Sequence, residues 1–185
     1  MSSETNEETV TERETEREFE RLLKVYSNRL AADEVIKNME TIKRQAWEHA
    51  IGRKLLLKEA RRRDIEVSED EIRTAIAGMT ERFGGEKGFG EHLEREGLTL
   101  ETLGAQLRDA RMVEKLVEIV TSGVPDATDD EASAYFHAHR NEFAESADYD
   151  QVKGIVRLAL ANATRNEKLT AYMEKLKEKS EQPVT

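Results

Sequence analysis

The stretch AIGRKLLLKEARRRDIEVSEDEI, residues 50–72, decides the fold, because it contains a helix end, a tight turn and a new helix start. The consecutive leucines at 55–57 sweep roughly 200° of a helix surface at 100° per residue. We therefore expect more than one neighbouring helix to cover them. The arginines at 61–63 suit the last turn of a helix, where cations meet the negative end of the helix dipole.

The turn that follows is specified by individual residues. Asp64 occupies the position after the helix end that Gly usually takes, and Asp tolerates the left-handed conformation better than most residues. Ile65 can then fold back on Ala60, as in a Schellman motif. Ser68 and Glu71 have the spacing of a capping box, which begins the next helix. The stretch therefore predicts helix, turn and helix.

Composition limits the classes of function. The chain has 185 residues, of which 37% are charged, against about 25% in an average soluble domain. Its net charge of −10 disfavours nucleic acid and anionic membranes as partners. No run approaches the roughly 18 apolar residues of a membrane span, so no membrane insertion is expected. The absence of cysteine excludes disulfides and thiolate chemistry.

The first ten residues lack the basic and apolar regions of a signal peptide. The localisation therefore stays open. The chain is typical of a cytoplasmic protein as it stands, and of a periplasmic or extracytoplasmic one if a signal has been removed.

Apolar residues recur at helical spacing along nearly the whole chain, and no alternating β-branched run predicts a sheet. We expect an all-α, elongated protein with one uninterrupted helix from Asp33 to Arg63, about 46 Å long. The other helices are expected from Thr11 to Leu30, from Glu69 to Phe83, around Phe89 and Leu93, from Thr99 to Val120, from Thr128 to Phe136 and over 148–180.

Breaks in this pattern predict the domain organisation. The segments are a disordered polar N-terminus (1–10), an N-terminal helical region (11–122), a linker with a short helix (123–147) and a C-terminal helix (148–180). We expect the C-terminal helix to pack on the N-terminal helices, since it has little else on which to bury its apolar face. The polar link at 144–148 could act as the hinge of a domain-swapped homodimer, which the sequence does not decide.

Residues that could carry catalysis do not form a recognisable set. His137 and His139 are two positions apart and point in different directions on a helix, and His49 and His92 lie in no acid–histidine motif. The glycines between 84 and 90 follow a helix, whereas a phosphate-binding loop follows a strand. We therefore predict no enzyme activity, no metal and no cofactor.

A set of aromatic and methionine side chains is the best candidate for binding. Each of them alone is more simply a core residue. Together, in a chain with few apolar residues and high charge, they suit an open scaffold that binds varied peptides. The candidate residues are Trp47, Met79, Phe83, Phe89, Tyr135 and Phe136.

The chain resembles the chaperone module of the SurA and PrsA family in the order and spacing of three segments. That module is similar to the trigger-factor chaperone domain. The three segments are 46–120, 129–143 and 149–179. The first contains the turn described above and the pattern F-x-x-x-L-x-x-x-G-L-T, which begins at Phe89. The second ends in NEF, and the third matches the family's returning C-terminal helix.

Family members usually carry a parvulin-type prolyl isomerase domain between the NEF and the final helix. Here only AESAD separates Phe143 from Tyr149, so we expect that domain to be absent. The resemblance implies an ATP-independent holdase that binds unfolded or nascent polypeptides through apolar grooves between helices, without isomerase activity. The alternative is a dedicated adaptor or assembly factor for a single protein partner.

Overall fold

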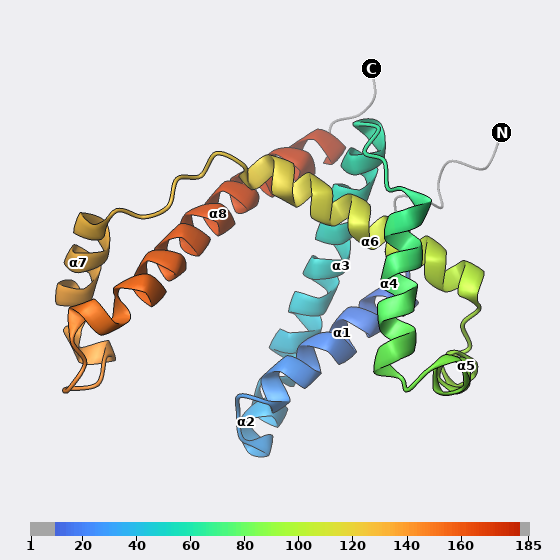
Figure 1. The fold of residues 1–185 in the computed structure, drawn as a ribbon, viewed down its shortest axis with the longest axis horizontal. Coiled ribbons are helices and arrows are strands. Elements are labelled where there is room, and N and C mark those ends of the chain that lie inside the picture. Colours follow the sequence, from blue (N-terminus) through green and yellow to red (C-terminus); the bar gives the residue numbers. More distant parts are fainter. Residues whose placement is uncertain (1–9, 182–185) are drawn as a thin grey trace. The chain divides into compact units, whose positions relative to one another are not determined.

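The structure is a computed structural model that describes residues 10–181, and within that range it contains helices and no strand (Figure 1). The predicted all-α fold is confirmed. The prediction of disorder for residues 1–10 lies, except for Val10, outside the described residues. The helices are α1 (Glu12–Ser27), α2 (Ala32–Lys37), α3 (Met39–Arg62), α4 (Glu69–Arg82), α5 (Glu86–Arg95), α6 (Leu100–Thr121), α7 (Asp129–Ala138), the 3-10 helix η1 (Arg140–Glu142) and α8 (Tyr149–Glu181).

The chain forms two compact units that divide after Leu116, within α6. The first unit contains α1 to α5 and most of α6, and the second contains the end of α6, α7, η1 and α8. The packing of α8 on the N-terminal helices therefore stays a prediction. Within residues 10–181, none of the helices combines the length and the apolar character needed to cross a bilayer.

The prediction of one uninterrupted helix from Asp33 to Arg63 is wrong. Asn38 separates α2 from α3, with φ −95° and ψ 5°. Its side-chain Nδ2 donates a hydrogen bond of 2.8 Å to the carbonyl oxygen of Glu34. A short amide side chain that bonds to nearby backbone competes with the helical pattern, so the regular helix restarts at Met39.

The core of the N-terminal helices lies between α1, α2 and α3. Its buried members are Leu22, Val35, Ile42 and Ala46. A buried carboxylate, Glu18, accepts a hydrogen bond of 2.8 Å from Arg21 and lies 3.7 Å from a guanidinium nitrogen of Arg53. Burial of this charge is tolerated because it has two cationic partners.

The turn between α3 and α4 has the predicted geometry. Asp64 has φ +53° and is the only residue other than glycine with a positive φ in the described chain. The Ile65 N–H donates to the Ala60 carbonyl at 3.1 Å and the Asp64 N–H to that of Arg61 at 3.0 Å, which completes a Schellman motif. The predicted Ser68–Glu71 capping box is also present.

In the second unit, α8 holds the preceding segment through long cationic side chains. Arg157 donates to the Ala127 carbonyl at 2.6 Å, and Lys168 donates to the Ser122 carbonyl at 2.7 Å. The buried Phe136 of α7 packs 5.8 Å from the ring of Tyr149, at the start of α8.

The link between η1 and α8 is ordered by one guanidinium group. Arg140 donates hydrogen bonds to the carbonyl oxygens of Ala144 (2.9 Å), Glu145 (2.6 Å) and Ala147 (3.2 Å). Its Cζ also lies 5.2 Å from the ring centroid of Phe136. Arg140 therefore fixes the short path of the chain into α8.

The left-handed residue at the α3–α4 turn supplies a test of the turn geometry. Asp64→Gly is expected to raise the free energy of unfolding by about 0.5–1 kcal/mol, because glycine adopts a positive φ without the steric cost of a Cβ. The measurement is the midpoint of urea unfolding. The reciprocal change, Gly97→Asp at φ +62°, should lower the midpoint. A lower midpoint for Asp64→Gly would contradict the account.

Candidate functional site

The helices α4, α5 and α6 enclose a small apolar cluster. Phe89, Leu93 and Leu103 are buried in it. The first turn of α5 requires glycine at Gly88, because a side chain there would collide with the carbonyl oxygen of Phe83. Partly buried apolar residues surround the cluster, namely Ile76, Met79, Leu98 and Leu107.

Next to this cluster, an open groove of about 520 Å³ lies between α4 and α6, and we call it the α4–α6 groove. Its apolar lining consists of Ile72 and Ala75 from α4, and of Leu107 and Ala110 from α6. Alanine at facing positions leaves room that larger side chains would fill. The polar lining consists of Asp70, Glu71, Thr74, Arg111 and Glu114.

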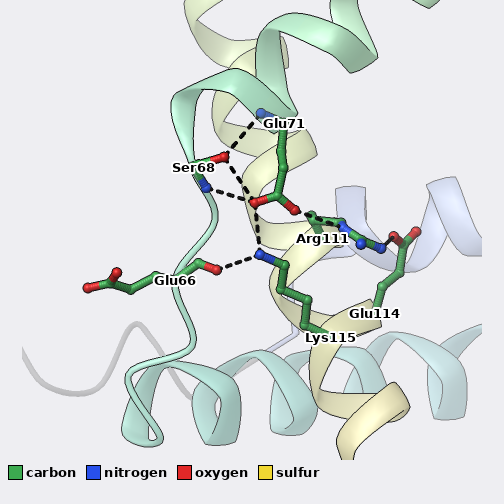
Figure 2. A network of polar contacts seen from close by, with 6 residues as sticks. All are labelled: Glu66, Ser68, Glu71, Arg111, Glu114 and Lys115. Carbon is green, nitrogen blue, oxygen red and sulfur yellow. Dashed lines mark hydrogen bonds and ion pairs between the residues drawn. The ribbon is translucent and has the colours of Figure 1, made fainter.

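A network of polar contacts joins the two walls of this groove (Figure 2). Glu71 accepts hydrogen bonds from Lys115 Nζ at 2.8 Å and from Arg111 Nε at 3.3 Å. Lys115 also donates to the Glu66 carbonyl at 2.8 Å, and Arg111 donates to Glu114 at 3.1 Å. The same Glu71 carboxylate caps the N-terminus of α4, so one side chain begins this helix and ties it to α6.

These contacts change the acidity of Glu71. The hydrogen bond from Lys115, followed by that from the Ser68 backbone, lowers the pKa of Glu71 from its ordinary value of 4.5 to about 2. Desolvation opposes this shift, and Arg111 adds to it. Glu71 is therefore a fixed anion at neutral pH.

A second groove, of about 560 Å³, shares Glu71 with the first. It contains the α3–α4 turn residues Ile65 and Val67 together with Met112 of α6. Arg108 and Lys115 supply its positive charge. The Glu71 network thus borders two open surfaces of the first unit.

The structure brings three of the six predicted binding residues together. Phe83 lies at the end of α4, where it is 38% exposed, stacks on His92 at 4.1 Å and lies 6.1 Å from Phe89. Met79 is partly buried against the same cluster, whereas Phe89 is only 5% exposed. Phe83 is thus the most accessible member of this group.

The other three lie elsewhere. Trp47 is 53% exposed on α3, because Ile42, Ala46 and Ala50 take the buried side of that helix. Tyr135 and Phe136 belong to the second unit. There Tyr135 is half-buried and stacks on His139 at 4.1 Å, and Phe136 is 4% exposed.

Sequence reasoning missed the alanines that open the α4–α6 groove. An alanine within a helical pattern does not by itself predict a binding site, so Ala75 and Ala110 could not be singled out. The only indication in the sequence was that both lie near apolar residues at helical spacing. Among the described residues, no group of three or more histidine, aspartate or glutamate side chains is arranged to hold a metal ion.

The depressed pKa of Glu71 predicts a pH dependence of stability. The folded state binds this proton less readily than the unfolded chain, so the stabilisation is complete above about pH 4.5 and is lost as the pH falls towards 2. Glu71→Gln should lower stability at neutral pH and flatten the loss of unfolding free energy between pH 5 and 2. Urea unfolding at a series of pH values measures both effects.

Glu14→Gln is the matched control, since Glu14 completes the capping box of α1 but lies 3.7 Å from its nearest cationic partner, Lys54. It should flatten the pH profile less than Glu71→Gln does. Equal profiles for the two variants would mean that capping, rather than the contacts with α6, accounts for the effect.

Comparison with known proteins identifies the family. Residues 3–117 match the family model described as the SurA-like N-terminal domain, and this range ends one residue after the first compact unit, which ends at Leu116. The Foldase protein PrsA of Clostridium acetobutylicum is 29% identical over 118 residues, which cover 62% of this chain and 35% of that protein. The chain therefore spans about a third of the length of this relative, and no solved structure is a significant match. Because the family model covers more than half of the chain, the protein belongs to the SurA-like N-terminal domain family.

Proposed function

We propose that this protein is an ATP-independent holdase that binds unfolded or nascent polypeptides through the α4–α6 groove, without prolyl isomerase activity. The observation that carries the proposal is the open groove of about 520 Å³ with an apolar floor and a charged rim. Its volume lies in the range of about 300–1,000 Å³ that is typical of binding pockets. The groove suits side chains of an extended segment.

The charged rim has a clear physical role in such a protein. Chains that expose apolar surface tend to associate, and surrounding charge keeps them soluble. Here Asp70, Arg111 and Glu114 border the apolar floor. Because a groove that accepts many sequences cannot be optimised for one, we expect weak binding.

Further apolar contacts are available near the groove. Met79 on α4 and Phe83, directly after α4, lie in or beside the same cluster that contributes Leu107 to the groove lining. Trp47 offers an exposed aromatic ring on α3. We include these three among the proposed client contacts, whereas Phe89, Tyr135 and Phe136 would need a rearrangement to reach a client fully.

Membership of the SurA-like family supports a chaperone-type role. The relative from Clostridium acetobutylicum is named a foldase, but only about a third of its length corresponds to this chain. The activity of that whole protein is therefore not assigned to this chain. The holdase proposal depends on the groove.

Filling the groove tests the proposal. Ala75→Phe places a ring in the groove, and Ala77→Phe makes the same change at an exposed position of α4 outside it. A chemically unfolded client is diluted into each protein without nucleotide, and light scattering is recorded. The unmodified protein and Ala77→Phe should suppress aggregation, and Ala75→Phe should require at least about threefold more protein for equal suppression.

Equal suppression by both variants would place the client elsewhere, with Trp47 and Phe83 the next residues to change. No suppression by the unmodified protein with several clients would refute the holdase proposal. A proline-containing test peptide should show no acceleration of cis–trans isomerisation in the presence of the protein.

A dedicated adaptor is the second candidate, favoured by two exposed aliphatic residues on α8. Ile155 is 72% exposed and Leu158 is 59% exposed, and they lie three positions apart on the helix. A single fixed partner could cover them. A stoichiometric partner in a pulldown, lost in an Ile155→Ser/Leu158→Ser variant and combined with no effect on model clients, would favour this function.

A further inference from the structure

We propose that the α4–α6 groove selects segments in which an aliphatic side chain is flanked by lysine or arginine. This inference rests on the proposed holdase function and narrows its substrate class. It follows from the balance of charge in the groove lining, which contains three carboxylates, Asp70, Glu71 and Glu114, and one cation, Arg111.

The three carboxylates are not equivalent. Glu71 is neutralised within the protein by Lys115 and Arg111, at 2.8 and 3.3 Å. Arg111 is shared between Glu71 and Glu114, so its single positive charge faces two carboxylates. The lining itself therefore holds more carboxylates than cations, and the other cationic partners of these carboxylates, Arg73 and Lys115, lie outside it.

Two of the three carboxylates are exposed, so a bound chain could reach them. The side chains of Asp70 and Glu114 are 78% and 62% exposed, and one comes from α4 and the other from α6. Asp70 pairs with Arg73, which is itself 78% exposed. An exposed pair of this kind contributes little stability, so a cation of the client can replace it at small cost.

The floor sets the size of the apolar side chain. Ala75 and Ala110 line the groove together with Ile72 and Leu107, and their short side chains fill little of its volume. A leucine, isoleucine or valine of the client would fill that space and bury apolar surface on both sides. A basic residue next to it in the client sequence would then lie near Asp70 or Glu114.

Charge on the whole chain acts in the same direction. The net charge of −10 attracts basic segments over a longer range and repels acidic ones. It also opposes the binding of a second copy of this protein, which carries the same charge. A basic, aliphatic segment of another polypeptide is therefore the occupant that the groove fits.

The experiment uses three fluorescein-labelled peptides with one common aliphatic core, flanked by lysine, serine or glutamate. Fluorescence anisotropy with the full chain measures their dissociation constants at low and at physiological salt. Two exposed charge pairs should make the lysine peptide bind about five- to tenfold more tightly than the serine peptide, and salt should reduce the difference. The glutamate peptide should bind most weakly.

The double variant Asp70→Asn/Glu114→Gln should reduce the preference for lysine over serine to about twofold or less. The matched control is Glu81→Gln/Glu101→Gln, which removes the same charge from α4 and α6 outside both grooves. It should keep the preference. Thermal melting of both variants verifies that they fold. The peptide series on the unmodified protein tests the preference for lysine even if a variant does not fold.

Equal binding of all three peptides would overturn the inference and leave the holdase function intact. Loss of the preference in the control as well would assign it to the general field of the protein, which also overturns the inference. If no peptide binds and aggregation is not suppressed, the proposed function itself fails. A dimer in sedimentation that Ala75→Phe abolishes would make a second copy the occupant.

Discussion

The carboxylate of Glu71 is the constraint on which the groove depends. It accepts the N–H of Ser68, which is needed to begin α4, and it bonds to Lys115 and Arg111 of α6. Two of the four apolar residues that line the groove are alanines, which contribute little apolar contact between its walls. The contacts of Glu71 add a polar link between the same two helices. Glu71 therefore holds the walls together while leaving the space between them open.

This arrangement explains how a chain with 37% charged residues can fold and still offer an apolar surface. Long cationic side chains join separate segments of the chain, as Arg53 does with the buried Glu18 and Arg157 does with the Ala127 carbonyl. The apolar residues are then divided into small local clusters. Some of them remain accessible at the edges of those clusters, as Phe83 does.

Local signals predicted much of the fold. The Asp64 turn and the capping box at Ser68 have the geometry expected from sequence, because each depends only on residues within a few positions. The same kind of signal failed at Asn38, where one side-chain hydrogen bond interrupts a periodicity that continues on both sides. Apolar periodicity locates a helical surface but does not locate a break of a single residue.

The groove could not be predicted because it depends on the register between two helices. Ala75 and Ala110 are 35 positions apart, and they line one groove in the structure, where Glu71 of α4 also reaches Lys115 and Arg111 of α6. The same reason applies to the aromatic residues that the sequence suggested for binding. Trp47 is accessible and Phe89 is buried, because another helix covers the side of the helix on which Phe89 lies but not the side on which Trp47 lies. The candidate site is thus a product of tertiary pairing, because its small residues come from two helices that the Glu71 contacts join.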